Sequence, residues 1–463
     1  MDKQLLADIE SYVAENEARL FNDIARLVAV PSVKGEAEPN APYGRGPAAA
    51  LDKGLEISRE LGLATENCDY RIGYAQLGEG GRDCDNYIAT ITHLDVVPCG
   101  DGWKEDPFKM REREGYIIGR GVMDDKGPSV LCLYAAKYFK DRGIPLRYPI
   151  RVLLGVDEEC GMADVEYYLE NFPQPLFCFT PDADFPMCNG EKGIFHGRMV
   201  SRCVPENIVE IDGGLVVNAV PDKAQAVVRA ADLASTDRVT AEKQADGLWH
   251  LTATGIGGHA SMPEGTVNAI GVLVNYILDN GIASPEEEKF FRALSLFHSD
   301  TTGAAYGVAA DDGLFQPLTI VGGVIKTVDG HFMQTLDSRY PTNTSGAKIT
   351  EIMNRTFADS AEIICDRDTV PFYMSLDRPD VQACLDAYNE ITGEDARPFT
   401  IGGGTYARHF KNAVSFGPEH HERPQPDFVG PIHGVDEGAC KAYLTEALKI
   451  YILALMKLEA LDY

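Results

Sequence analysis

The hydrophobic pattern of the first part of the chain switches repeatedly between the period of a helix and that of a buried strand. Apolar residues at helical spacing predict helices over 5–29, 47–62, 127–143 and 164–172. Apolar runs between them predict strands over 86–97, 149–156 and 175–182. This alternation is typical of an α/β layer with a mostly parallel sheet.

The pattern changes in the middle of the chain and then returns. From about residue 194 to 375, shorter strands with alternating polarity are mixed with helical segments such as 266–281. Beyond 377, the α/β style resumes with predicted helices over 380–393 and 438–461 and a short strand over 413–418. We therefore expect a discontinuous α/β domain formed by 1–193 and 377–463, with an inserted α+β domain over 194–376.

Composition narrows the possible partners. The 463 residues are enough for two or three domains, and the net charge of −29 argues against a nucleic-acid partner, which needs a basic footprint. The first residues do not resemble a signal peptide, and no apolar run is long enough to span a membrane. The 11 cysteines are odd in number and form no C-x-x-C pair, which favours a reducing compartment, so we expect a cytoplasmic protein.

Four consecutive links between the predicted strands and helices carry carboxylates, and the first of them also carries a histidine. Ligands of an open α/β sheet bind beyond the carboxyl ends of its strands. The residues expected at this edge are His93, Asp95, Asp124, Asp125, Asp157, Glu158, Glu159 and Asp182. A single His-x-Asp would be interpreted as a surface pair, and Asp125 alone as a helix N-cap. Four converging carboxylate-bearing links, however, need a counter-charge. Imidazole with several carboxylates and no thiolate favours Zn, Mn or Co, and more than four ligands favour two ions.

These residues also carry a resemblance to a known family. HLDVVP, GRGVMDDKG, DEE, PDADFP and NGEKG resemble the aminoacylase/carboxypeptidase family of co-catalytic di-metal peptidases, and in particular its PepV-like dipeptidase branch. NAVPDKA, GIGGHASMP, DSRYP, GGGTYARHF and IHGVDEG continue the match in order over nearly the whole chain. The resemblance implies a three-layer catalytic domain of the zinc-exopeptidase, phosphorylase/hydrolase-like type and an inserted lid domain.

The resemblance also implies the roles of the metal-site residues. His93 and Asp182 would bind one ion, Glu159 and His433 the other, and Asp124 would bridge the two. Asp95 would hold the His93 ring by accepting its second N–H. Glu158 would be the general base that takes a proton from a metal-bridged water and passes it to the leaving amine.

The inserted domain would supply the remaining groups, again by resemblance. His259 would stabilise the oxyanion, and Asn218 would assist near the same oxygen. Arg339 would clamp a substrate carboxylate, to which Gly402, Gly403, Gly404 and Thr405 would offer backbone N–H groups. Taken alone, these residues would be interpreted as a solvated loop histidine, a surface arginine and a plain turn.

Some positions depart from the family pattern or stay open. Asp436 stands where many members of the family have asparagine, which adds an acid near the site. Asp157 receives no catalytic role, although it adjoins the two glutamates. Five other histidines show no acidic partner pattern and are interpreted as structural: His196, His250, His298, His331 and His409.

The resemblance predicts a metal-dependent dipeptidase, an exopeptidase that hydrolyses short unblocked peptides. It also predicts a monomer, because the long insert would replace a partner's lid. An aminoacylase, a desuccinylase or a carboxypeptidase on the same di-metal scaffold is the alternative. A catalytically dead binding protein would be expected to lack Glu158 or a metal ligand, and all of these residues are present.

Overall fold

The chain forms two compact units. The structure is a computed structural model, and it describes residues 3–420 and 423–463. Unit 1 comprises Met1–Asn189, Tyr373–Phe399 and Gly404–Tyr463, and unit 2 comprises Gly190–Phe372 and Thr400–Gly403. The chain therefore leaves unit 1 and returns to it twice.

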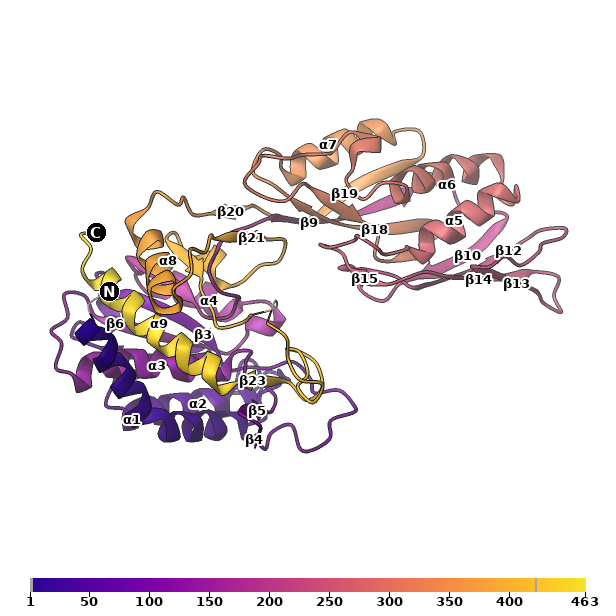
Figure 1. The fold of residues 1–463 in the computed structure, drawn as a ribbon. Helices are drawn as coiled ribbons and strands as arrows, with labels where there is room; N and C mark the ends of the chain where they lie inside the picture. Colours follow the sequence, from indigo (N-terminus) through magenta and orange to yellow (C-terminus); the bar gives the residue numbers. More distant parts are fainter. Residues whose placement is uncertain (1–2, 421–422) are drawn as a thin grey trace. The chain divides into compact units, whose positions relative to one another are not determined.

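A mixed, mainly parallel sheet forms the centre of unit 1 (Figure 1). Its order is β1-β2-β6-β3-β7-β22-β8-β20, with β21 paired to β8. The strands are β1 (Ala64–Cys68), β2 (Ile72–Leu77), β3 (Ile88–His93), β6 (Ile150–Gly155), β7 (Phe177–Thr180), β8 (Cys188–Glu191), β20 (Phe372–Tyr373), β21 (Phe399–Ile401) and β22 (Ala413–Ser415). Strands β6, β3, β7 and β22 are parallel neighbours, whereas β1 and β2 are antiparallel at one edge.

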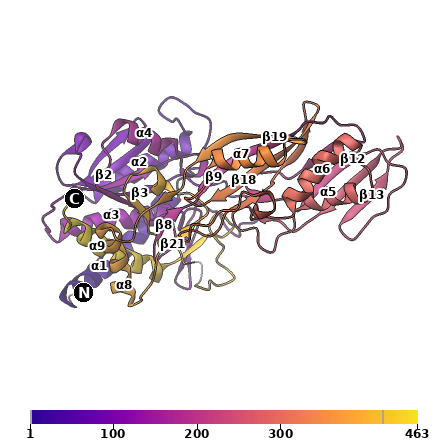
Figure 2. The ribbon, with the colours of Figure 1, turned by 90° about the horizontal axis from the view of Figure 1, so that it is seen from above.

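Helices cover both faces of this sheet, as expected for strands that are buried throughout. They are α1 (Lys3–Val28), α2 (Arg45–Glu60), α3 (Lys126–Asp141), α4 (Ala163–Asn171), α8 (Pro379–Thr392) and α9 (Lys441–Glu459). Leu154 and Phe179 point to one face, where they approach Gly54 of α2 and the ring of Tyr451 in α9. Arg151 points to the other face and donates to Tyr168 of α4. Helix α9 also packs against α3 and α8 (Figure 2).

A second, three-stranded sheet of unit 1 corrects one predicted boundary. It consists of β4 (Arg111–Arg113), β5 (Tyr116–Ile118) and β23 (Gly438–Cys440). The predicted helix over 438–461 therefore begins late, because Ala439 pairs with Ile117 and the segment Gly438–Cys440 is held as a strand. Three short 3-10 helices also belong to this unit: η1 (Gly81–Asp83), η2 (Glu158–Cys160) and η4 (Tyr406–His409).

Unit 2 is built on an antiparallel sheet in the order β13-β14-β12-β10-β17-β18-β9-β19, with β16 paired to β18. The strands are β9 (Gly193–Ser201), β10 (Ile208–Gly213), β12 (Lys223–Val228), β13 (Val239–Lys243), β14 (Trp249–Thr254), β16 (Thr319–Val321), β17 (Ile325–Val328), β18 (His331–Tyr340) and β19 (Ala361–Thr369). A separate pair joins β11 (Ala219–Val220) to β15 (Gly258–His259).

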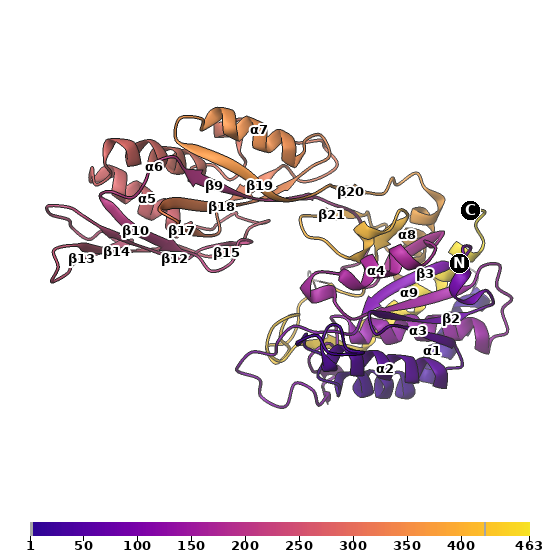
Figure 3. The same cartoon turned by 180° about the vertical axis from the view of Figure 1, so that it is seen from behind.

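One apolar core holds the helices of unit 2 against its sheet. Helices α5 (Ala269–Asp279), α6 (Pro285–His298) and α7 (Gly346–Thr356) contribute Leu273, Phe290 and Met353 to this core, and the short η3 (Ala304–Tyr306) adds Tyr306. Figure 3 shows these helices on one side of the strands. The alternating burial of β9 follows, since every second residue faces the core.

The predicted fold class is confirmed: a mainly parallel α/β sheet with a separate antiparallel sheet domain. Among the described residues, no helix is both long enough and apolar enough to cross a membrane.

Candidate active site

Three parallel strands bring their carboxyl ends to one edge of the unit 1 sheet. Strand β3 ends at His93, β6 is followed by Asp157 and η2, and β7 is followed by Asp182. Because β3 lies between β6 and β7 in register, these residues are neighbours. The link before α3 adds Asp124, and the loop before β23 adds His433.

Asp124 stands between two imidazoles. Its Oδ1 lies 2.9 Å from His93 Nε2, and its Oδ2 lies 2.8 Å from His433 Nε2. Asp182 Oδ2 is 3.7 Å from His93 Nε2, and Glu159 Oε2 is 3.1 Å from His433 Nε2. The cluster thus has two sides, each with one histidine and one terminal carboxylate, joined by Asp124.

Glu158 lies at the same cluster. Ligand atoms of His93, Glu158 and Asp182 lie within 4.8 Å of one another, and so do those of His93, Asp124 and Glu159. Both triads have the composition of a divalent-metal site. Glu158 and Glu159 are adjacent in η2, yet each belongs to a different triad.

The polar atoms of this cluster fit a cation. His93 Nε2 and Asp124 Oδ1 are buried and have no hydrogen-bond partner among the described residues, although they lie 2.9 Å apart. Burial and the negative charge of Asp182 raise the pKa of Glu158 well above its usual range. Burial and the charge of Asp124 raise the pKa of Asp182 to about 7. A positive ion would remove both the unsatisfied atoms and the repulsion between carboxylates.

Asp95 holds the backbone of the two glutamates. Its Oδ1 accepts the N–H of Glu158 at 3.2 Å, and its Oδ2 accepts the N–H of Glu159 at 3.2 Å. Its carboxylate lies 3.5 Å from His93 Nδ1, which is closer, at 3.1 Å, to the backbone oxygen of Asp95. Asp95 therefore acts on the position of η2 at least as directly as on the imidazole.

The remaining acids at this edge have structural partners. Asp157 is buried and pairs with Lys34 Nζ at 2.5 Å, and it also accepts the N–H of Ala163. Asp125 occupies the N-cap position of α3 without a capping bond from its side chain. It accepts the backbone N–H of His93 instead. The structure thus gives Asp157 a role in fixing the turn after β6.

Glu437 is a residue of this site that sequence reasoning missed. Its buried carboxylate accepts the N–H groups of Gly121 and Met123 at 3.1 Å and that of Asp124 at 3.3 Å. It also pairs with Arg120 Nη1 at 2.7 Å. Glu437 therefore joins the loop of His433 to the loop of Asp124. Its position in the motif IHGVDEG was the only feature of the sequence that could have pointed to Glu437.

The neighbouring Asp436, the departure from the family pattern, points elsewhere. It pairs with Arg111 Nη2 at 2.5 Å and with Lys104 Nζ at 3.2 Å. Two cations thus neutralise the additional acid.

His259 occupies a polar corner of unit 2. Its Nδ1 accepts the backbone N–H of Ser261 at 3.2 Å and lies 2.7 Å from Ser261 Oγ. Since a backbone N–H can only donate, the neutral ring carries its proton on Nε2. Desolvation and the charge of Arg339 lower the pKa of His259, which keeps the ring neutral. The imidazole therefore presents an Nε2–H donor.

Arg339 belongs to the same corner. Its Nε and Nη2 donate to the two oxygens of Asp337 at 2.8 and 3.0 Å, and its Nη1 donates to Gly402 O at 3.0 Å. A Cβ on Gly402 would lie 3.0 Å from Ser261 Cβ and 3.9 Å from Arg339 Cγ. Gly402 therefore lies close to both Ser261 and Arg339.

His196 corrects one expectation from the sequence. It has an acidic partner, because its Nε2 lies 2.9 Å from Asp337 Oδ2. The sequence pattern could not show this partner, since it lies on the neighbouring strand β18.

The other predicted binding residues are placed as follows. The backbone oxygen of Asn218 accepts the N–H of Ala260 at 2.9 Å, so Asn218 lies beside the His259 strand. Gly403 belongs to unit 2, whereas Gly404 and Thr405 belong to unit 1. The Thr405 hydroxyl is 2.8 Å from Ser415 Oγ and accepts the N–H of Ala407, and thus caps η4.

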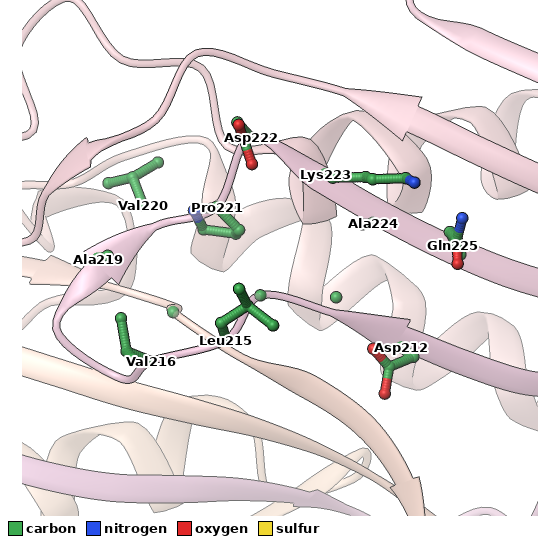
Figure 4. A pocket seen from close by; sticks show the side chains of 13 residues that line it. Asp212, Leu215, Val216, Ala219, Val220, Pro221, Asp222, Lys223, Ala224 and Gln225 are labelled. Atoms are coloured by element: carbon green, nitrogen blue, oxygen red, sulfur yellow. The ribbon is translucent and has the colours of Figure 1, made fainter. Parts of the chain in front are cut away.

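A cavity of about 390 Å³ is lined mainly by the segments 212–216 and 219–225 (Figure 4). It is lined by Leu215, Val216 and Val220 together with Asp212, Asp222 and Lys223. It includes neither His259 nor Arg339, so we assign it no chemistry.

Comparisons with known proteins found relatives over nearly the whole chain. The model of the family described as "Peptidase family M20/M25/M40" matches residues 89–457. A Bacillus subtilis (strain 168) protein named "Putative dipeptidase YtjP" is 32% identical over 438 residues, which cover 90% of this chain and 93% of that protein. A "Beta-Ala-Xaa dipeptidase" of Lactobacillus delbrueckii subsp. lactis is 28% identical, with 95% of this chain and 96% of that protein covered.

A solved structure shows a similar fold. The crystal structure of human carnosine dipeptidase 1 covers 99% of this chain with a TM-score of 0.59 and 14% sequence identity, and all of that chain is matched. At this identity, the likeness concerns the fold alone.

Proposed function

Because the chain belongs to peptidase family M20/M25/M40 and is a metallopeptidase, we propose that it is a dipeptidase acting on short peptides with free ends. The observation that carries the proposal is the two-sided cluster in which Asp124 lies between His93 and His433. The names of both relatives contain the word dipeptidase, which favours this substrate class over the other amides that such a site could hydrolyse.

The cluster suits two divalent ions. One ion would be held by His93, Asp182 and Asp124, and the other by His433, Glu159 and Asp124. Zinc is proposed first, with manganese and cobalt as alternatives, because imidazole and carboxylate ligands suit all three. When bound, such ions act as Lewis acids toward a carbonyl oxygen and lower the pKa of water.

Glu158 is proposed as the general base. Its carboxylate lies within 4.8 Å of ligand atoms of His93 and Asp182, and the backbone contact with Asp95 fixes its position. Glu158 takes a proton from the attacking water and gives it to the leaving nitrogen, which lets the amide bond break without expelling an anionic amine.

The residues of unit 2 are proposed to bind the peptide. The His259 Nε2–H would donate to the carbonyl oxygen as negative charge develops there, and Asn218 would assist at the same oxygen. Arg339 would take the terminal carboxylate, supported by N–H groups of Gly402, Gly403, Gly404 and Thr405. In this proposal, the inserted domain over 194–376 is the lid.

A substrate panel tests the dipeptidase activity. With zinc supplied, we expect hydrolysis of Ala-Ala that is at least about tenfold more efficient in kcat/KM than hydrolysis of N-acetyl-alanine, because only the dipeptide has both free ends. The opposite preference would make the protein an aminoacylase. N-succinyl amino acids and longer peptides with a free carboxyl end test the desuccinylase and carboxypeptidase alternatives in the same panel.

We also propose a monomer in the cytoplasm. No disulfide joins any of the eleven cysteines among the described residues, which fits a reducing compartment. Light scattering in solution tests the oligomeric state, and a mass of two chains would contradict the monomer.

A further inference from the structure

We propose that Asp337 and His196 are positioning residues that hold Arg339 in the orientation in which it binds the carboxylate of the substrate. This inference rests on the proposed function, and it adds a relay of two residues behind Arg339. All three side chains belong to unit 2.

The register of the sheet creates the relay. Asp337 and Arg339 are two residues apart on β18, so both side chains leave the strand on the same face. His196 on β9 is the direct cross-strand partner of Asp337. The three polar groups therefore form a row on one face of two adjacent strands.

Hydrogen bonds to other described residues occupy three of the donors of Arg339. The guanidinium has five donors. Asp337 accepts two of these, at 2.8 and 3.0 Å, and Gly402 O accepts a third at 3.0 Å. Within the part of the chain that the structure describes, one N–H on each terminal nitrogen is left without an acceptor, and a second carboxylate can accept these two N–H groups.

Burial makes this orientation specific. Asp337 is 1% exposed and Arg339 is 6% exposed, so neither group can rely on water. Burial alone would raise the pKa of Asp337, but hydrogen bonds from His196 and Arg339 outweigh it and lower that pKa. His196 Nε2–H donates to the Asp337 oxygen that also receives Arg339 Nη2, and thus fixes the carboxylate plane.

The decisive readout is the KM for Ala-Ala compared with the KM for its carboxyl amide, Ala-Ala-NH2. Only the free dipeptide has the carboxylate that Arg339 would bind. We expect Asp337→Asn to raise the KM for Ala-Ala about tenfold or more and to leave the KM for the amide within about twofold, because asparagine offers a single acceptor oxygen to the fork. A change in kcat alone, or an equal change in KM for both substrates, would overturn the proposal.

His196 supplies a second test that does not depend on a buried substitution. We expect His196→Ala to raise the KM for Ala-Ala about threefold, and His196→Gln to restore it, because the glutamine amide can still donate to Asp337. A His196→Ala protein with the original KM would overturn the relay, even if Asp337→Asn fails to fold.

A matched control is available on the same strand. Arg198 of β9 forms a similar fork with Asp366, but the two side chains are 40% and 39% exposed. Asp366→Asn should leave both KM values unchanged, since exposed pairs contribute little. An equal KM effect of Asp366→Asn would contradict the proposal.

Arg339→Ala distinguishes a failure of the relay from a failure of the proposed function. If it removes the preference for Ala-Ala over the amide while the Asp337 and His196 variants do not, the relay is wrong and the proposed function stands. If Arg339→Ala leaves that preference unchanged, the carboxylate assignment of the proposed function fails, and the relay fails with it.

Discussion

Two adjacent glutamates occupy different positions at this site. Glu158 and Glu159 are consecutive in η2, and Asp95 accepts the backbone N–H of each. Glu159 approaches His433 at 3.1 Å, whereas Glu158 lies with His93 and Asp182. The pair can therefore hold different roles while sharing one backbone anchor.

The different positions of Glu158 and Glu159 predict different effects on metal content for two matched substitutions. Glu158→Gln should keep both metal equivalents and lower kcat by about 100- to 10,000-fold, the usual contribution of a general base. Glu159→Gln should lose metal, because it removes a ligand carboxylate. Metal content by mass spectrometry and kcat for Ala-Ala measure both. An empty site in the Glu158 variant would show that Glu158 is a ligand and not the base.

Replacement of His259 is predicted to lower the turnover number. Its Nε2–H is free to donate because Nδ1 is occupied by Ser261. His259→Ala should lower kcat for Ala-Ala about a hundredfold, the cost of one oxyanion donor. His250→Ala, at an exposed position of β14, is the control and should have no effect. An unchanged kcat in the His259 variant would remove this residue from the site.

At the scale of elements, two loops far apart in the sequence are joined by one carboxylate. Glu437, just before β23, accepts three N–H groups from the link that carries Asp124 and pairs with Arg120. Removing one partner of a buried charge pair costs about 3–5 kcal/mol in proteins. The positions of Asp124 and His433 thus depend on a residue that is itself no ligand.

This dependence predicts a coupled loss of metal affinity and stability. Glu437→Gln should weaken metal binding about 10- to 100-fold, as substitutions behind metal ligands commonly do. It should also lower the melting temperature of the metal-free protein. Glu112→Gln, which breaks only the more exposed pair with Lys441, should leave both nearly unchanged. Calorimetric titration with metal measures the metal affinity of the two variants. Equal affinities would contradict the role of Glu437.

The parallel strands of unit 1 explain why part of the site could be predicted from the sequence. His93, Asp182 and the Asp157–Glu159 run follow strongly apolar strands, and parallel strands bring their ends together, so their clustering could be expected. The confirmed α/β class rests on the same periodicity. The segment Gly438–Cys440 was predicted as helix because its pairing with β5 is a tertiary contact.

The partners of Glu437 and His196 could not be predicted from the sequence either. Glu437 acts on N–H groups of a loop more than three hundred residues earlier in the chain, and backbone groups leave no signal in a sequence. His196 meets Asp337 through the register of β9 with β18, which periodicity alone does not give.

At the scale of the whole molecule, the carboxylates beyond the strand ends of the unit 1 sheet lie in a strongly acidic chain. The net charge is −29, and the carboxylates at the sheet edge repel one another at short range. A bound ion is thus expected to stabilise the folded state by mass action, in addition to its role in catalysis.

Metal removal should therefore lower the melting temperature. A ligand at 100 times its dissociation constant stabilises the folded state by about 2.7 kcal/mol. Chelator-treated protein should melt several degrees lower than zinc-loaded protein, and added zinc should reverse the shift. The double variant His93→Ala, His433→Ala is the control and should show no zinc-dependent shift. A zinc-dependent shift of equal size in this control would place the stabilising ion elsewhere.

The most direct test of a two-ion dipeptidase is a titration of metal-stripped protein with zinc while Ala-Ala hydrolysis is measured. We predict no hydrolysis without metal and a rate that rises until about two equivalents of zinc are bound per chain. The same titration with manganese and cobalt compares the three candidate ions. Full activity of the stripped protein, or saturation at a single equivalent, would contradict the two-ion site built around Asp124.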